Sequence, residues 1–282
     1  MCGLFGFVAK KGFCVDLSVI KDAADLAAVR GGDAHGFSKV CNGHVYTYKS
    51  PGCITDNMDA LDWLKGATSI VGHTRFSTSG HWSKNENNQP IQYGSSAIEQ
   101  SFVIAHNGTL GNYTALSKRM ELPLTTGCDS EVIGLLLQMS EKEKLEDRIK
   151  DACYMMRSSM GGVDEKEGQR SLTPNFAVTY MDKDRVILIR DGNPLQLTEK
   201  DEGIYWCSVE IEKGSVELPN FSHRTFPVES NANDVGEYPK ILRGKKVKTY
   251  TNTNLNAYGY SRNWNGKSYV ETGQSFQQGW EF

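Results

Sequence analysis

The second residue of the chain is a cysteine, and its place beside Met1 allows a particular chemistry. If Met1 is removed, Cys2 carries a thiol and a free α-amino group on one residue. An unperturbed α-amine has a pKa of about 7.7–8.0, so it can act as a general base near neutral pH. Cys2 could therefore supply nucleophile and base together. Taken alone, such a cysteine is more often an ordinary buried residue.

Residues 72–80, GHTRFSTSG, form a polar cluster that contains one arginine and follows a short apolar run. The planar guanidinium of Arg75 could bind a carboxylate through two parallel hydrogen bonds, and an amino-acid substrate offers one carboxylate. An isolated arginine is more often a surface or ion-paired residue, so this segment alone decides nothing.

A second polar turn follows the apolar residues 102–105, within the sequence AHNGTLGNY at residues 105–113. The Asn107 side-chain amide and the Gly108 backbone N–H could together form an oxyanion hole. An Asn-Gly pair at the end of a strand is also common as a plain turn.

Two carboxylates lie at the start of a predicted helix in residues 127–136, GCDSEVIGLL. Asp129 could bind a substrate ammonium group, and the charge of Glu131 in the first turn suits the helix dipole. The alternative is that Asp129 or Ser130 only caps the helix.

Together, and in this order, these segments resemble the glutaminase domain of the class II glutamine amidotransferases. That family includes glucosamine-6-phosphate synthase and glutamine phosphoribosylpyrophosphate amidotransferase. The resemblance covers residues 2–218. The matching stretches are Cys2-Gly3 with Gly6, residues 30–36, residues 72–80, His106-Asn107-Gly108 with Asn112, Asp129-Ser130-Glu131 and residues 190–195.

The resemblance implies catalytic and carboxylate-binding roles for individual residues. Cys2 would be the nucleophile, with its own amine as the base. Asn107 and the N–H of Gly108 would form the oxyanion hole. Arg75, helped by Thr78, would hold the α-carboxylate of glutamine.

The resemblance also implies an ammonium site and supporting residues. Asp129 would hold the α-ammonium group. Arg30 and Asp33 would be architectural residues near the nucleophile, and His73 would be a further supporting residue.

Three residues of the 72–80 segment depart from the family pattern. The sugar-isomerase-type enzymes have a histidine where this chain has Ser79, and Phe76-Ser77 replaces the commoner aromatic-Ala pair. These changes alter the rim of the expected pocket.

The order of elements is typical of an α+β fold, because runs of strand length precede and follow helical segments. The resemblance implies a four-layer αββα sandwich of the N-terminal nucleophile hydrolase type. We expect strands over residues 2–9, 36–40, 43–49, 69–74, 101–105, 176–181, 186–190 and 204–208. We expect helices over residues 22–30, 113–120, 130–139 and 142–160.

The resemblance assigns residues 1–218 to a glutaminase domain and residues 219–282 to a C-terminal extension. The extension is rich in Asn, Gly, Ser, Tyr and Gln, and we expect it to be partly ordered. Its basic run Arg243–Lys248 and later aromatic residues could dock a partner. The composition slightly favours a solvated or disordered segment instead.

Composition and charge exclude several classes of protein. The formal net charge of -3 gives no bulk attraction to nucleic acid, and no apolar run is long enough to span a bilayer. Seven cysteines form no CxxC pair and six histidines form no HExxH motif, so we expect no metal site and no disulfide framework. We expect a cytoplasmic protein without a cofactor.

The sequence therefore predicts an enzyme that hydrolyses glutamine through a Cys2 thioester and releases ammonia for a separate synthase. One alternative is a free-standing amidase that acts on another γ-glutamyl compound. A second is a non-catalytic relative used as a binding protein, which the presence of Cys2, Asn107 and Asp129 disfavours.

Overall fold

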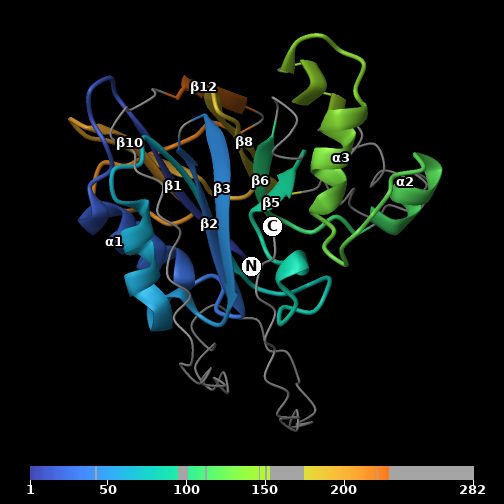
Figure 1. Cartoon of the computed structure of the whole chain (residues 1–282), viewed down its shortest axis with the longest axis horizontal. Coiled ribbons are helices and arrows are strands. Elements are labelled where there is room, and N and C mark those ends of the chain that lie inside the picture. Colours follow the sequence, from blue (N-terminus) through green and yellow to red (C-terminus); the bar gives the residue numbers. More distant parts are fainter. Residues whose placement is uncertain are drawn as a thin grey trace, which may run out of the picture. The chain divides into compact units, whose positions relative to one another are not determined.

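The computed structural model describes residues 1–41, 43–94, 101–111, 113–145, 147–149, 151–152, 175–220 and 222–228. All of them belong to one compact unit, Met1–Val247. Within this unit, two antiparallel β-sheets pack face to face, and helices cover their outer faces (Figure 1). The four-layer arrangement expected from the resemblance is confirmed.

The larger sheet has seven strands in the order β11-β9-β10-β1-β4-β2-β3. Every neighbouring pair is antiparallel. Its strands are β1 (Gly3–Ala9), β2 (Ala34–Cys41), β3 (His44–Pro51), β4 (Ser69–Arg75), β9 (Gln196–Glu199), β10 (Gly203–Cys207) and β11 (Val216–Glu217).

The smaller sheet has five strands in the order β12-β8-β7-β6-β5, also antiparallel throughout. Its strands are β5 (Ile91–Tyr93), β6 (Phe102–Asn107), β7 (Phe176–Met181), β8 (Arg185–Asp191) and β12 (Ser222–Pro227). The turn between β7 and β8 is held by Asp182, whose Oδ1 accepts hydrogen bonds from the backbone N–H groups of Asp184 and Arg185.

Helix α1 (Leu17–Ala28) covers the outer face of the larger sheet (Figure 1). It begins after Asp16, whose Oδ1 accepts the backbone N–H of Ser18 at 2.8 Å, as a capping residue should. The face that it buries is made of small and branched residues: Ile20, Ala23, Ala24 and Ala27. The 3-10 helix η1 (Ile54–Leu64), kinked at Asn57, packs beside it.

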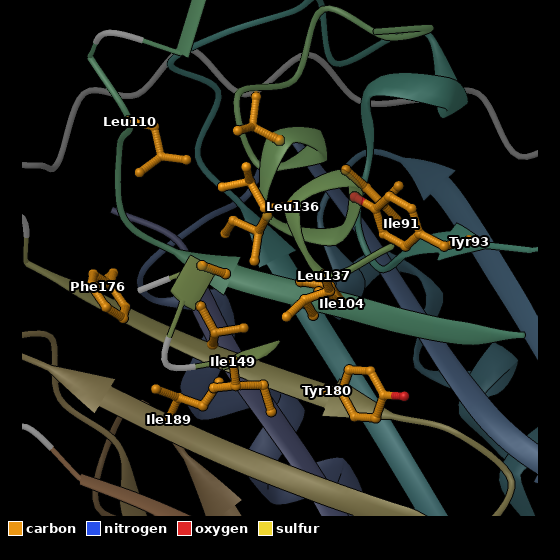
Figure 2. Packing of buried hydrophobic residues seen from close by; sticks show 14 of the residues in the cluster. Ile91, Tyr93, Ile104, Leu110, Leu136, Leu137, Ile149, Phe176, Tyr180 and Ile189 are labelled. Atoms are coloured by element: carbon orange, nitrogen blue, oxygen red, sulfur yellow. The ribbon is translucent and has the colours of Figure 1, made fainter. Parts of the chain in front are cut away.

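Helix α3 (Glu131–Met139) covers the outer face of the smaller sheet, near α2 (Tyr113–Arg119). Figure 2 shows Leu136 and Leu137 among the buried residues of the cluster that also contains Ile104 of β6. The close approach of α3 to β5 depends on Gly134, because a Cβ at this position would lie 2.1 Å from the ring of Tyr93.

The layer between the sheets is a third apolar cluster, built by alternate residues of strands from both sheets. Leu4, Val71 and Trp206 come from the larger sheet, and Val103 and Ala105 come from β6. Since the sheets are held together by this layer, the residues at the ends of its strands have fixed positions.

The expected strands are all present, and three of the four expected helices are confirmed. The elements that the pattern did not predict are short or irregular: β5, β9, β11, β12, η1 and η2 (Asn85–Asn87). Of the helix expected over 142–160, residues 145, 147–149 and 151–152 are helical, and the remainder lies outside the described residues.

Strand β12 pairs with β8 along its whole length. The smaller sheet therefore includes residues that we assigned to the extension after residue 218. The rest of that extension, including Arg243–Lys248, lies outside the described residues, and its role stays a prediction. No helix within the described ranges is long and apolar enough to cross a membrane.

Candidate active site

One pocket gathers residues from separate segments of the chain. Its lining includes residues before β1, at the end of β4, after β6 and before α3. The lining residues are Cys2, Arg75, Phe76, Thr78, Ser79, Gln89, Gly108, Cys128, Asp129 and Ser130. The fold thus brings together five residues predicted from the sequence, namely Cys2, Arg75, Thr78, Gly108 and Asp129.

Cys2 lies beside the end of β4 because β1 and β4 are antiparallel, with Gly3 opposite Thr74. Its Sγ lies 3.4 Å from the backbone N and 3.5 Å from the carbonyl oxygen of Phe76. A Cβ at Gly3 would lie 2.4 Å from the carbonyl oxygen of Ala27. The nucleophile can therefore be placed here only if a glycine follows it.

With Met1 in place, burial favours the protonated form of the Cys2 thiol. Burial raises the pKa of Cys2 to about 11, and the Phe76 N–H and the positive N-terminus lower it only in part. The thiolate is the reactive form of a cysteine. A nucleophile in this position therefore needs a base close to it.

The loop after β4 is fixed by the segment that follows α1. Asp33 Oδ2 accepts the backbone N–H of Ser77 at 2.7 Å, and the N–H of Asp33 donates to the carbonyl of Arg75 at 2.9 Å. Gly31 packs on the same peptide, since a Cβ there would lie 2.5 Å from the carbonyl carbon of Arg75. Arg30 is thereby placed so that its Nε donates to the carbonyl of Cys2 at 2.9 Å.

Among the described residues, the guanidinium of Arg75 is held entirely by neutral acceptors. Its side chain is buried, with 2% of the residue exposed. Nη1 donates to Asn88 Oδ1 at 2.6 Å, and Nη2 donates to the carbonyl of Gly80 at 3.0 Å and to the carbonyl of Ser79. The positive charge is fixed in place without being neutralised.

The carboxylate of Asp129 is held in the same manner by neutral donors. Asp129 is 3% exposed. Its Oδ1 accepts the Ser79 hydroxyl at 2.9 Å, and its Oδ2 accepts the backbone N–H of Leu110 at 2.7 Å. Throughout the part of the chain that the structure describes, neither Arg75 nor Asp129 has an ion-pair partner.

Glu131 orders the loop that carries Asp129. Each of its carboxylate oxygens accepts two hydrogen bonds, from the backbone and hydroxyl groups of Thr125 and Thr126, at 2.6–2.8 Å. Glu131 is therefore more than a favourable charge at the start of α3. It ties the preceding loop to the first turn of the helix.

Asn107 and Gly108 lie where β6 ends, as expected. The Asn107 side chain is buried, and neither atom of its amide has a hydrogen-bond partner among the described residues. The Asn107 carbonyl accepts Nδ2 of Asn193 at 2.6 Å, which fixes the backbone at this point. Position 108 must be glycine, because a Cβ would lie 2.4 Å from Nε2 of His106.

His73 is one of four predicted site residues that do not line the pocket, together with Asn107, Arg30 and Asp33. It is fully buried on β4, and neither ring nitrogen has a partner among the described residues. Burial lowers its pKa to about 3, and the nearby positive charge of Arg75 adds to this effect. His73 is therefore a neutral residue of the interior.

Two polar residues of the site, Gln89 and Cys128, were not predicted from the sequence. Gln89 Oε1 accepts the backbone N–H of His106 at 2.6 Å, and its Nε2 donates to the Ser130 hydroxyl at 3.0 Å. Cys128 is a second thiol in the lining. No spacing or motif in the sequence singles out Gln89, since its partners lie far along the chain.

The described residues contain no group of three or more His, Cys, Asp or Glu side chains that could hold a metal ion. The groups gathered in the pocket are a thiol, a guanidinium, a carboxylate and backbone and hydroxyl donors. This set can bind a zwitterion and attack an electrophilic carbon next to it.

Comparison with known proteins gives relatives in both sequence and structure, although no family model matches the chain. The chain is 30% identical over 215 residues to an amidophosphoribosyltransferase of Archaeoglobus fulgidus, covering 74% of this chain and 43% of that protein. It is 25% identical over 267 residues to a glutamine–fructose-6-phosphate aminotransferase of Bacillus cereus, covering 86% of this chain and 42% of that protein. The chain spans less than half the length of these curated relatives.

Solved structures share the fold. Glutamine phosphoribosylpyrophosphate amidotransferase from B. subtilis matches with a TM-score of 0.60 at 22% identity, over 82% of this chain and 50% of that one. A glutamine aminotransferase class-II domain protein from Silicibacter pomeroyi matches with a TM-score of 0.50 at 13% identity, over 79% and 94%. Sequence likeness and the shared two-sheet architecture together show that the chain belongs to the class II glutamine amidotransferases, as a domain related to those of amidophosphoribosyltransferase and glutamine–fructose-6-phosphate aminotransferase.

Proposed function

We propose that the protein hydrolyses the side-chain amide of L-glutamine and releases glutamate and ammonia. One observation carries the proposal: the Cys2 thiol shares a pocket with a buried cation, Arg75, and a buried anion, Asp129, neither of which is paired with another charge among the described residues. A buried charge without a counter-charge is unfavourable. The carboxylate and ammonium of an α-amino acid would supply both counter-charges at once.

The proposed binding mode follows from these two charges. Arg75 would bind the α-carboxylate, with the exposed Thr78 helping, and Asp129 would bind the α-ammonium. The side chain of the amino acid would then extend toward Cys2. A γ-carboxamide at that distance from the α-carbon would present its carbon to the thiol.

The proposed reaction needs a base, because burial favours the protonated form of the thiol. Removal of Met1 would give Cys2 a free amine, which would take the thiol proton as sulfur attacks the carboxamide carbon. The side-chain N–H of Asn107 and the backbone N–H of Gly108 would stabilise the oxyanion. The amine would return the proton to the leaving nitrogen, ammonia would depart, and water would hydrolyse the thioester to glutamate.

We further propose that the ammonia goes to an acceptor bound by a separate synthase. The charged side chains of the pocket, Arg75 and Asp129, are both used by the glutamine head group in this scheme. They leave no charged residue in the pocket to bind a second, acceptor molecule.

The direct test is ammonia release from L-glutamine by protein whose N-terminus has been established by intact-mass measurement. Protein beginning at Cys2 should be active, and Cys2→Ala should abolish activity. A diazo or chloroketone analogue of glutamine should label Cys2, whereas the exposed Cys14 serves as the control position that should stay unmodified. Full activity in protein that retains Met1, or labelling at another cysteine, would overturn the mechanism.

A second test separates head-group binding from chemistry. Arg75→Lys and Asp129→Asn should each weaken glutamine binding by about ten- to a hundredfold, since each removes a charge-assisted hydrogen bond. The wild type should hydrolyse simple amides that lack the α-carboxylate and α-ammonium only poorly. Neither variant should change this low rate of hydrolysis much. Equal losses on such amides would mean that the pocket is not built for an amino acid. A preference for γ-glutamyl amides over glutamine would point to the alternative amidase.

A further inference from the structure

Ser79 contacts both charged residues of the pocket. Its carbonyl oxygen accepts a hydrogen bond from Nη2 of Arg75. Its hydroxyl donates to Oδ1 of Asp129 at 2.9 Å, although 50 residues separate the two in sequence. The residue also lines the pocket together with Cys2.

The hydrogen bonds fix the direction in which the Ser79 hydroxyl donates. A serine hydroxyl has one proton and two acceptor lone pairs. The backbone N–H of Asp129 donates to Ser79 Oγ at 3.0 Å, so Oγ acts there as the acceptor. Its single proton is then directed to Asp129 Oδ1.

The consequence for Asp129 is that both carboxylate oxygens are held. Oδ1 takes the Ser79 hydroxyl at 2.9 Å, and Oδ2 takes the N–H of Leu110 at 2.7 Å. Longer contacts reach Oδ1 from Ser130 Oγ at 3.5 Å and from Cys128 Sγ at 3.9 Å. Each oxygen of a carboxylate can accept about two hydrogen bonds, so acceptor capacity for a cation remains on Oδ2. The plane of the carboxylate, however, is set before any ligand enters.

From these contacts we infer that Ser79 is a positioning residue that sets the spacing between the Arg75 cation and the Asp129 anion, and so selects ligands that carry an α-ammonium beside a carboxylate. The inference rests on the proposed function only in naming the α-amino acid as the ligand. It concerns binding and not the chemical step. A ligand with the carboxylate alone makes no use of the Ser79–Asp129 contact.

The test compares L-glutamate, which has the α-ammonium, with glutarate, which lacks it. Titration calorimetry with the full chain gives the ratio of the two affinities without any turnover. Ser79→Ala should weaken L-glutamate binding about tenfold and leave glutarate binding unchanged, because a hydrogen bond to a charged group is removed. Ser79→Thr keeps the hydroxyl and should restore the wild-type ratio.

The matched control is Ser77→Ala, which removes a hydroxyl from the same loop. Ser77 Oγ donates to the carbonyl of Gly80 at 3.0 Å and not to Asp129. If this variant loosens the loop, it should therefore weaken the binding of L-glutamate and of glutarate by the same factor. If Ser79→Ala behaves in that way, or leaves the ratio as in wild type, the inference is wrong.

The outcome is distinguishable from a failure of the proposed function. If wild type binds L-glutamate more tightly than glutarate but releases no ammonia from glutamine, the hydrolase proposal fails and the Ser79 test still decides its own question. If glutamine is hydrolysed but the affinity ratio does not depend on Ser79, the hydrolase proposal stands and the inference about Ser79 fails.

Discussion

Nε of Arg30 donates a hydrogen bond to the carbonyl oxygen of Cys2 at 2.9 Å, which ties the end of α1 to the proposed nucleophile. Arg30→Lys keeps a positive charge but loses the planar donor at this point. We expect kcat for glutamine hydrolysis to fall about tenfold or more, as for loss of one charge-assisted hydrogen bond. Steady-state kinetics of ammonia release measure this, and KM should change much less.

The control for this prediction is Arg119→Lys, at an exposed position in the last turn of α2. It should leave both kinetic constants unchanged. If Arg30→Lys raises KM while kcat stays normal, Arg30 acts on substrate binding and not on the backbone of Cys2.

Asn193 should matter for turnover although it does not line the pocket. Its Nδ2 donates to the carbonyls of Asn107, at 2.6 Å, and Asn175, at 3.1 Å. Asn193→Asp replaces this donor with a carboxylate oxygen facing two carbonyls. We expect a larger loss of kcat than Asn193→Ala gives, because repulsion displaces the backbone that presents the oxyanion donors. A loss of the same size in both variants would indicate only a missing contact.

Acid should destabilise the fold through buried histidines. Burial lowers the pKa of His73 to about 3, below the ordinary value of about 6.5 in the unfolded chain. The unfolded state therefore binds more protons between these values, so stability is complete above about pH 6.5 and is lost as the pH falls below it. At pH 5.5, His73 alone should reduce the free energy of unfolding by about 1.4 kcal/mol relative to neutral pH.

Urea unfolding at pH 7.5 and pH 5.5 measures this difference. His73→Gln should make stability less dependent on pH by that amount, whereas the exposed His44 can be replaced by Gln as the control. If both variants keep the wild-type difference between the two pH values, His73 does not take part in the linkage.

Gly134→Ala should destabilise the protein even though alanine favours a helix by about 0.8–1.0 kcal/mol over glycine. The added Cβ would lie 2.1 Å from the Tyr93 ring, and overpacking of this kind costs about 1–3 kcal/mol. Gly111→Ala is the matched control, because no atom lies within 4 Å of its Cβ. Denaturant unfolding of the two variants decides, and a stabilised Gly134→Ala would show that α3 can move outward freely.

The sequence predicted the elements that carry clear apolar runs. Such runs placed β1, β4 and β6, and the strands expected over residues 176–181 and 186–190 match β7 and β8. Three-residue β5 and two-residue β11 are too short to show a period, and they form because neighbouring strands offer unpaired edges. Strand β12 falls in a region whose polar composition resembles that of a linker.

The family resemblance named five of the residues that line the pocket, and the polar contacts that hold them could not be predicted. Ser79 and Asp129 meet across 50 residues, and Asn193 and Asn107 meet across 86. Local propensity contains no information on such pairs, because they depend on how the two sheets bring strand ends together. The pattern likewise marked Glu131 as a dipole partner, whereas its four hydrogen bonds to the preceding loop require the folded chain.

The three groups proposed to hold the substrate, Cys2, Arg75 and Asp129, are chemically unlike and are fixed on different segments of the chain. Three different fixed contacts around one tetrahedral carbon allow the pocket to distinguish the two enantiomers of an amino acid. A D-amino acid that keeps its carboxylate on Arg75 and its ammonium on Asp129 must direct its side chain away from the sulfur. D-glutamine should therefore bind without being hydrolysed, and the ratio of ammonia release from the two enantiomers would report how rigidly the three points are held.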